Sequence, residues 1–315
     1  MKIAIIGAGM AGLACAEKLN SVGYPLKLLD KGRRAGGRMS TRGISTVLGD
    51  ASFDHGAQYF TVRHPSFALW VEEWRREGDV ARWLSAGPDA WVGTPTMDAP
   101  VQQMASRLDV RWSATVASLS RDAGGWRLHG DGVDDELFDI ALITLPAEQA
   151  MLLLKPWDAH MAARAAATPS LPCWTVMAAF ATRLPVEADI HRDHGIIGWA
   201  ARNSAKPGRS GPESWVIQAG PEWSMQHVED DPKAVLSGLL SAFSKRVNVT
   251  LPDPLVALAH RWRYARSGCA GEGLLWNPDL GLGACGDWLL GPRVECAWLS
   301  GHRLADAIIA DAKRR

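Results

Sequence analysis

Short apolar runs alternate with helical patterns along the first thirty residues of the chain. Residues 2–6 are an apolar run, residues 13–19 are apolar at helical spacing, and residues 26–29 form a second apolar run. These patterns predict a strand, a helix and a second strand. The order is that of a βαβ unit, in which the two strands lie parallel in one sheet.

The same two periodicities continue along the rest of the chain. Helical spacing predicts helices over residues 65–78, 101–108, 232–247 and about 294–311. Strands are predicted over residues 110–119, 139–147, 173–182, 195–200, 214–219, 255–262 and 280–285. Strands that are joined by polar loops, as in the middle of the chain, favour a mixed or antiparallel sheet that forms one wall of a cleft.

A glycine-rich turn follows the first apolar run. Gly7, Gly9 and Gly12 precede the first predicted helix, and Asp30 stands at the end of the second run, eighteen residues after Gly12. In this context the glycines make a tight turn, admit a pyrophosphate and pack the helix on the strand. The helix start offers unpaired N–H groups to the phosphates, and Asp30 is placed to accept hydrogen bonds from ribose hydroxyls. We predict a bound dinucleotide; a βαβ turn without a ligand is the alternative.

A second glycine pair, in a basic loop, follows Asp30. Gly36 and Gly37 would let the backbone approach a pyrophosphate, and Arg38 would pair with its charge; a solvated loop is the alternative. With this pair the chain resembles the flavin-containing amine oxidase superfamily, where such a doublet accompanies FAD rather than NAD. Residues 54–60 are similar to the superfamily segment that runs beside the flavin ring.

The end of the chain resembles the closing FAD motif of the same superfamily. It has a strand, then Gly286 and Asp287, then a loop and a terminal helix. The resemblance implies that Asp287 accepts from a ribityl hydroxyl, although a turn or helix-cap role is the alternative. It also implies that the helix start near Val294 faces the pyrimidine end of the flavin, where its positive end stabilises the anion of reduced flavin.

The resemblance implies a full set of cofactor contacts. The backbone of Val116 is the candidate adenine contact, and Cys269 does not match the covalent attachment site of monoamine oxidases, so FAD is expected to be non-covalent. The residues expected to hold FAD are Gly7, Gly9, Met10, Ala11, Gly12, Asp30, Lys31, Gly37, Arg38, Met39, His55, Gly56, Ala57, Gln58, Val116, Gly286, Asp287, Arg293, Val294 and Glu295.

These motifs predict an α/β protein of the amine oxidase/p-hydroxybenzoate hydroxylase type. A Rossmann-like FAD-binding domain with a parallel sheet is expected from residues 1–61, 95–147 and 256–315. A substrate domain with a mixed or antiparallel sheet is expected from residues 62–94 and 148–255.

Composition narrows the classes of partner. The 315 residues are 47% hydrophobic and carry 34 basic against 34 acidic side chains, so nothing indicates general polyanion binding, and no nucleic acid is expected. The five cysteines lack metal-ligand spacing, and we expect free thiols and no metal. The chain starts directly in a predicted strand and has no apolar run of about 20 residues, so we expect a cytoplasmic protein without a membrane partner.

Further segments are similar to the bacterial renalases over nearly the whole chain. They are residues 30–42, 54–61, 91–93, 199–207, 260–266 and 286–301. The resemblance implies oxidation of the 2- and 6-dihydro isomers of NAD(P) to NAD(P)+. In that reaction hydride passes to flavin N5, and O2 reoxidises the flavin to give H2O2. The expected partners are therefore a dihydronicotinamide dinucleotide and O2.

This chemistry needs positioning and ring stacking more than an acid or a base, because aromatisation drives hydride loss. The candidate catalytic residues are Gln58, Tyr59, Arg202, Asn203, His260 and Trp262, with Lys206 and Arg261 also beside the substrate. His260 is expected to be a hydrogen-bonding or structural residue rather than a base. Among the 15 tryptophans, Trp199, Trp215 and Trp223 are candidate walls of the cleft, and core packing is the alternative for each.

Two other functions remain open. The first is a flavin amine oxidase or desaturase of the same fold, which would need an aromatic pair facing the flavin. The second is a flavin-fold protein that binds a partner without turnover. Retention of Gly7, Gly9, Gly12, Asp30, Arg38 and Asp287 disfavours the second, since a fold without a cofactor has no need of them all.

Overall fold

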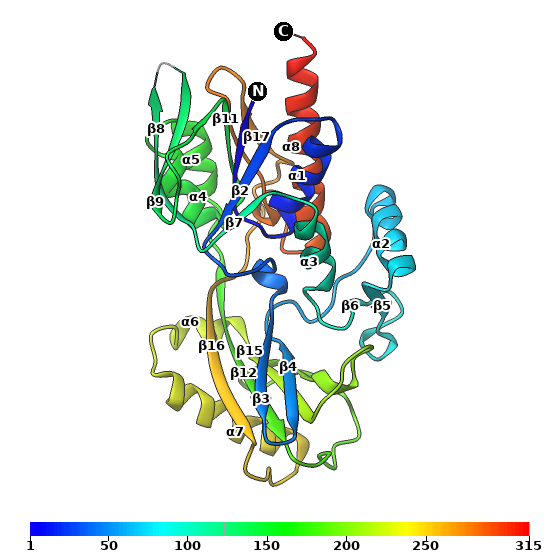
Figure 1. The fold of residues 1–315 in the computed structure, drawn as a ribbon. Helices are drawn as coiled ribbons and strands as arrows, with labels where there is room; N and C mark the ends of the chain where they lie inside the picture. Colours follow the sequence, from blue (N-terminus) through cyan, green and yellow to red (C-terminus); the bar gives the residue numbers. More distant parts are fainter. Residues whose placement is uncertain (123, 315) are drawn as a thin grey trace.

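The computed structural model describes residues 1–122 and 124–314, which form two lobes joined by long strands (Figure 1). The upper lobe contains a six-stranded sheet in the order β17-β18-β11-β1-β2-β7. All neighbours in it are parallel except β17 and β18. The strands are β1 (Ile3–Ile6), β2 (Leu26–Asp30), β7 (Val110–Trp112), β11 (Ile140–Ile143), β17 (Leu275–Asn277) and β18 (Leu282–Ala284). The predicted Rossmann-like α/β class is confirmed.

Helices cover both faces of this sheet, which explains why β1 is apolar at every position. Ile3 and Ile5 pack with α1 (Met10–Ser21), α3 (Ala99–Ser106) and α8 (Val294–Ala312). Ala4 and Ile6 point the other way and pack with α4 (Ala147–Leu154) and α5 (Ala159–Ala166). Successive side chains of a strand face opposite sides, so a strand covered on both faces has no polar position.

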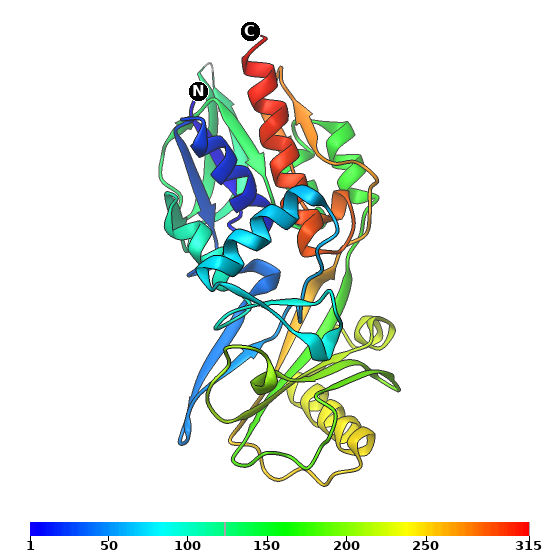
Figure 2. The same ribbon diagram turned by 90° about the vertical axis from the view of Figure 1, so that its right-hand side faces the viewer.

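Helices α1 and α8 run side by side (Figure 2). Their backbones approach closely at Gly301, where an added Cβ would lie only 2.2 Å from the carbonyl oxygen of Ala11. The first and last helices of the chain are thereby fixed against each other, and both of their N-termini lie at the junction of the lobes.

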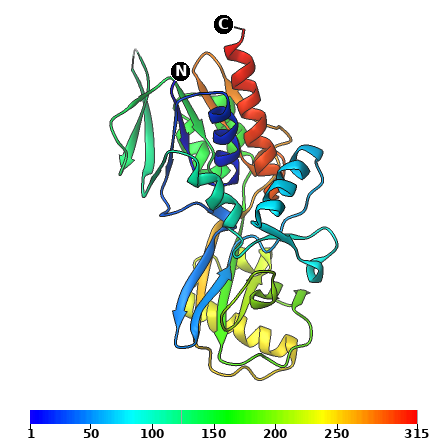
Figure 3. The same ribbon diagram turned by 45° about the vertical axis from the view of Figure 1, so that its right-hand side comes forward.

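One predicted strand is broken. Residues 110–119 were expected to be continuous, but β7 ends at Trp112, and Ser113 adopts a φ of 57°. The backbone amide of Ser113 donates to the carbonyl of Gly32 at 2.8 Å. The left-handed residue turns the chain out of the parallel sheet into a separate antiparallel sheet, visible at one side in Figure 3, of β8 (Thr115–Asp122), β9 (Gly125–Asp131) and β10 (Leu137–Phe138).

The lower lobe is built on a five-stranded antiparallel sheet in the order β13-β14-β15-β12-β16. Its strands are β12 (Leu171–Phe180), β13 (Ile190–His194), β14 (Ile197–Arg202), β15 (Glu213–Ala219) and β16 (Val256–Arg266). Helix α7 (Pro232–Val247) packs on one face, beside the short α6 (Pro221–Gln226). The hairpin of β3 (Thr41–Thr46) and β4 (Gly49–Asp54) covers the other face, where Phe53 meets Met177 and Val216 (Figures 1 and 3).

Packing divides the chain differently from the predicted boundaries. The β3–β4 hairpin and strand β16 were expected in the FAD-binding domain, but β16 is a strand of the lower sheet, and the hairpin, a two-stranded sheet of its own, packs on it. Helices α4 and α5 were expected in the substrate domain but pack on the parallel sheet. Likewise α2 (Pro65–Glu77), with β5 (Val80–Arg82) and β6 (Trp91–Gly93), shares the core of α1 and α8. An apolar pattern shows that a face is covered but not which sheet covers it.

No helix in the described part of the chain is long and apolar enough to cross a membrane.

Candidate functional site

The carboxyl ends of the parallel strands meet at the junction of the lobes, with β1 between β11 and β2 at the point where strand order reverses. Gly7, with a φ of +112°, leads from β1 into α1. An added Cβ on Gly12 would lie 2.1 Å from the carbonyl of Gly7, whereas one on Gly9 would meet nothing within 4 Å. Gly12 therefore packs helix on strand, and Gly9 borders open space at a helix start that no side chain caps. This cradle fits a pyrophosphate.

Asp30 ties two glycine-rich loops together. Its carboxylate accepts from the backbone amides of Ala8 and Gly32, both at 2.7 Å. Each carboxylate oxygen keeps a further lone pair, so the predicted ribose contact stays compatible with this geometry. Lys31 is exposed beside it.

The second glycine loop lies against the first. Gly37 has a φ of +52°, and a Cβ there would lie 3.5 Å from the Cα of Gly9. The guanidinium of Arg38 makes a two-pronged ion pair with Asp287, at 2.8 and 2.7 Å. Two residues that were assigned to adjoining parts of the cofactor, the pyrophosphate and the ribityl chain, are thus direct partners. The pair joins the loop after β2 to the loop after β18.

The start of α8 is also at the junction. Gly286 donates its backbone amide to Ser300 Oγ at 3.0 Å, and Arg293 caps the helix without a side-chain hydrogen bond. Glu295 was predicted to contact FAD, but its buried carboxylate accepts from the amides of Arg63 and His64, at 2.7 and 2.6 Å. Its contacts fix the segment that leads into α2.

Val116 lies away from the predicted position. It pairs with Gly130 in the β8–β9 ladder rather than standing at the end of a parallel strand. The break at Ser113 is the reason, and the adenine contact at Val116 stays a prediction.

Residues 55–57 lie against the second glycine loop. The amide of Ala57 donates to the carbonyl of Arg38 at 2.8 Å. An added Cβ on Gly56 would lie 2.0 Å from the same carbonyl and 3.5 Å from Cζ2 of Trp262. Only glycine fits there, between the cofactor loop and the lower sheet. Met39 is buried in the same loop.

Above Gly56 stands a group of side chains that we call the aromatic wall, namely His55, Thr175, Gln218, His260 and Trp262. The ring centroids of His55 lie 5.0 Å from those of both His260 and Trp262, which are 4.7 Å from each other. Trp262 Nε1 donates to the carbonyl of His55 at 2.9 Å, and Gln218 Nε2 donates to that of Gly56 at 2.8 Å.

The two histidines of the wall are uncharged at neutral pH. Burial, with the charge of Arg42 added, lowers the pKa of His260 to about 4. Burial, then His260 and Arg42, lowers the pKa of His55 to about 4 as well. The wall therefore consists of rings, an amide and the fully buried hydroxyl of Thr175, and carries no charge of its own.

Sequence analysis missed Thr175 and Gln218. Thr175 stands opposite both Gln218 and His260 in the antiparallel ladders, so the three share one face of the lower sheet. Their signal was a polar residue inside an otherwise apolar strand.

Three predicted substrate residues are structural instead. Arg202 is fully buried and pairs with Asp189 at 3.1 Å and Glu213 at 3.6 Å. Asn203 is fully buried and donates to the carbonyl of Ser52 at 2.9 Å. Lys206 is 2% exposed. Each of the three side chains is buried against other segments of the chain, which the local sequence does not reveal.

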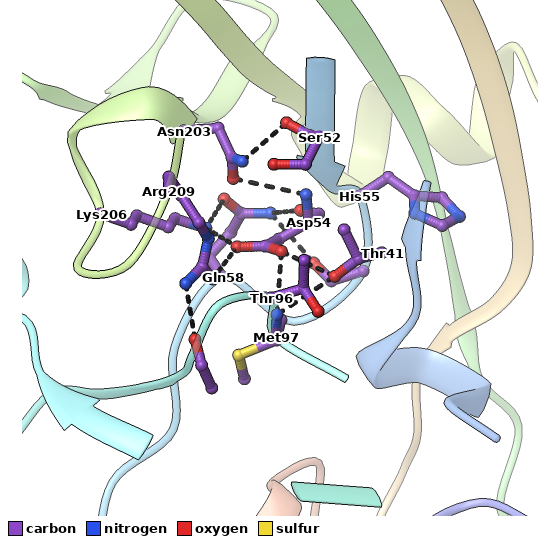
Figure 4. Close-up of polar contacts among 12 residues, drawn as sticks. Thr41, Ser52, Asp54, His55, Gln58, Thr96, Met97, Asn203, Lys206 and Arg209 are labelled. Atoms are coloured by element: carbon purple, nitrogen blue, oxygen red, sulfur yellow. Dashed lines mark hydrogen bonds and ion pairs between the residues drawn. The ribbon is translucent and has the colours of Figure 1, made fainter. Parts of the chain in front are cut away.

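Lys206 belongs to a buried charge node, which we define as Thr41, Asp54, Asn203, Lys206 and Arg209 (Figure 4). One carboxylate oxygen of Asp54 accepts from Lys206 at 3.0 Å and also from Arg209; the other accepts from Thr41 Oγ1 at 2.7 Å. Burial would raise the pKa of Asp54, but the charges of Lys206 and Arg209 outweigh burial and hold that pKa well below its usual range. Burial lowers the pKa of Lys206 to about 8 against the pull of Asp54.

Gln58 and Tyr59 were both predicted near the flavin ring; the structure shows the partners of each, and the place of Tyr59 beside the flavin stays a prediction. Gln58 is buried at the edge of the node, where Oε1 accepts from Lys206 at 3.2 Å and Nε2 donates to the carbonyl of Gly56 at the same distance. Its amide groups are thus used within the protein. The ring of Tyr59 lies 5.6 Å from that of Trp199, and Trp199 is partly buried.

The remaining candidates face away from the wall. Trp215 is fully buried under α7, and Trp223 stacks on His227 with 4.2 Å between ring centroids. Arg261 lies over Trp174 and pairs with Glu229 at 2.9 Å. Core packing, the alternative for Trp215, is confirmed.

Similar proteins point to one family. The family described as NAD(P)-binding Rossmann-like domain matches residues 5–97, and the one described as flavin containing amine oxidoreductase matches residues 68–309. A solved structure from Exiguobacterium sp. 255-15, provisionally named protoporphyrinogen oxidase, is similar with a TM-score of 0.79 at 13% identity, over 98% of this chain and 99% of that one. Cyclohexylamine oxidase from Brevibacterium oxydans IH-35A is similar with a TM-score of 0.71 at 12% identity, over 99% of both chains. At such identities the likeness shows the fold alone.

Two curated relatives match over a short stretch. One is 1-hydroxycarotenoid 3,4-desaturase of Flavobacterium sp. (strain P99-3), 40% identical over 63 residues, which is 20% of this chain. The other is phytoene desaturase (neurosporene-forming) of Rhodobacter capsulatus, 38% identical over 68 residues, which is 22% of this chain. The matched stretch spans 12% of the length of each desaturase. With the second family match covering most of the chain, the protein belongs to the flavin-containing amine oxidoreductase family.

Proposed function

We propose that this protein oxidises the 2- or 6-dihydro isomers of NAD(P) to NAD(P)+, with non-covalent FAD as hydride acceptor. When bound, FAD supplies the hydride acceptor and the path of electrons to O2 that yields H2O2. The Gly9 cradle, the Gly37 loop and the start of α8 are the parts of the chain that would hold it. The similarity of the chain to renalases supports the choice of substrate.

The observation that carries the proposal is the uncharged aromatic wall beside Gly56. A dihydronicotinamide becomes aromatic when it loses hydride, so the site must hold a flat ring close to the acceptor and needs no base. The rings of His260 and Trp262 offer edges and faces to such a ring, and Gln218 fixes the loop beneath it. Because both histidines are uncharged at neutral pH, neither would need to gain or lose a proton while hydride leaves the substrate.

An amine substrate fits this wall less well. Alkylamines are cations at neutral pH, with pKa values of about 10. None of the five wall residues carries a carboxylate, and the nearby Asp54 is already paired with Lys206 and Arg209. The wall therefore lacks a counter-charge for a cation.

The test is anaerobic stopped-flow of the purified holoprotein, in which bleaching of the flavin absorbance reports its reduction. The panel is ordinary 4-dihydro NADH, the 2- and 6-dihydro isomers, and primary amines that include cyclohexylamine. Rapid bleaching by a dihydro isomer alone is the expected result. Bleaching by an amine would assign the protein to amine oxidation instead, and no bleaching by any compound would leave a binding role.

A further inference from the structure

One arginine at the edge of the aromatic wall has no partner among the residues that the structure describes. Arg42 lies in β3 opposite Phe53, on the hairpin face whose residues Ile44 and Phe53 pack against the lower sheet. Paired residues of antiparallel strands share a face, so the side chain of Arg42 is directed toward that sheet as well. It is half-buried.

Its isolation contrasts with the arginines around it. Arg38 pairs with Asp287, Arg209 with Asp54, and Arg261 and Arg263 with Glu229. In the described part of the chain, the guanidinium of Arg42 forms neither a hydrogen bond nor an ion pair. A half-buried guanidinium gives up part of its hydration, so leaving five donors unused favours an external acceptor.

The positive charge of Arg42 acts on the two histidines of the aromatic wall. It lowers the pKa of both His55 and His260, so its guanidinium lies within electrostatic reach of both rings. Because the histidines are neutral, Arg42 supplies an uncompensated positive charge on this side of the site. Such a charge attracts anions and repels protonated amines.

We propose that Arg42 binds a phosphate of the substrate and thereby selects phosphate-bearing dihydronicotinamides. This inference rests on the proposed function and adds the group that recognises the dinucleotide. A planar guanidinium matches two phosphate oxygens, and its charge-assisted hydrogen bonds are stronger than neutral ones. Arg42 is thus a binding and specificity residue, and the rings of the wall position the nicotinamide from which hydride leaves.

The experiment compares a full substrate with a truncated one. Wild type, Arg42→Gln, Arg42→Lys and the control Arg263→Gln are assayed with 6-dihydro-NAD and with the phosphate-free 1,6-dihydronicotinamide riboside. Arg263→Gln removes the same charge from an exposed side chain paired with Glu229. We expect Arg42→Gln to raise KM for 6-dihydro-NAD about 10- to 100-fold, with kcat kept and the riboside affected less than about twofold. The lysine variant should fall between, because it keeps the charge and loses the planar fork.

The outcomes separate this inference from the proposed function. Equal effects on both substrates, or loss of FAD from Arg42→Gln during purification, would overturn the role of Arg42 while leaving the reaction in place. If wild type oxidises neither substrate, the proposed function fails, and Arg42 is then tested by titrating the holoprotein with NAD+ and following the flavin spectrum. A response that is weakened about tenfold or more in Arg42→Gln supports an anion site. No response in wild type, or equal responses, would refute it.

Discussion

Asp54 and His55 are neighbours in the chain, yet their side chains belong to regions of opposite character. Asp54 points into the charge node, where it is fully buried and meets Lys206 and Arg209. His55 points away from that node, as Figure 4 shows, and lies among the neutral rings of His260 and Trp262. One region holds charges that satisfy one another, and the other holds rings and an amide without charge.

The difference shows that the residues that hold the backbone segments together are separate from the residues proposed to bind the substrate. The charge node joins β4 to the loop after β14, and Met97 donates its backbone amide to Asp54 at 3.1 Å. It therefore fixes three segments beside the site. In the aromatic wall, Trp262 Nε1 and Gln218 Nε2 donate to the backbone carbonyls of the loop beneath, and these bonds use the edge of the indole ring rather than its face.

Among the variants proposed here, Asp54→Ala should lower the stability of the folded protein most. It leaves Lys206 and Arg209 buried without their counter-charge, and breaking a buried pair by removing one partner costs about 3–5 kcal/mol. We expect a clearly lower midpoint of thermal unfolding, while the exposed control Asp89→Asn changes stability by less than about 0.5 kcal/mol. Equal midpoints for both variants would show that the node does not stabilise the junction.

Lys206→Met should cost less, about 1–2 kcal/mol, since Arg209 still pairs with Asp54 and a side chain of similar volume fills the space. The pKa of Lys206 is about 8 in the folded protein against an ordinary 10.5, so between these values the unfolded chain binds more protons. Its contribution to stability therefore rises with pH across that window. Chemical unfolding measured at several pH values across the window should show the free energy of unfolding of wild type rising relative to that of Lys206→Met. A constant difference would contradict the burial of a charged Lys206.

Gln218→Leu should have a smaller effect, and on the wall rather than on the node. It removes the amide that holds the carbonyl of Gly56, and an ordinary hydrogen bond contributes about 1 kcal/mol. We expect FAD to bind about fivefold more weakly, measured by fluorescence titration of the apoprotein. Gln103→Leu, at a half-buried position of α3, is the control, and an equal affinity in both variants would remove Gln218 from the site.

The smallest expected effect is that of pH on flavin reduction. With both wall histidines at a pKa of about 4, neither changes charge between pH 5.5 and 8, and the bleaching rate should vary less than about twofold there. Toward pH 4 both rings gain protons beside Arg42, and the rate should fall. Stopped-flow bleaching across this range checks it. An inflection near pH 6.5 that disappears in His260→Gln would show that His260 acts as a base.

Much of the cofactor side of the molecule could be predicted because its requirements are local. Gly7 and Gly37 adopt positive φ values, and the Cβ that Gly12 lacks would collide with its own turn. Such demands are met by residues a few positions apart, so they appear as a spacing in the sequence. Helix α7, with Asp231 capping its start and Asn248 its left-handed end, was predictable with the same bounds for the same reason.

The substrate side could be predicted only in part. His260 and Trp262, both predicted around the substrate, lie together in the aromatic wall, but Arg202, Asn203 and Lys206 are buried against partners within the protein. Lys206 meets Asp54 across 152 positions of sequence, and nothing near either residue indicates the other. Arg42 was visible only as one basic residue of a motif.

The sequence by itself determined the βαβ unit, the glycine turns and the terminal motif, because backbone conformation and hydrophobic period are set by residues close together in the chain. Tertiary structure alone decided which polar side chains form hydrogen bonds and ion pairs within the protein and which remain available to a ligand. That choice depends on which charges and carbonyls the folded chain brings within hydrogen-bond distance. Asp54 and His55, adjacent in sequence, differ in role for this reason.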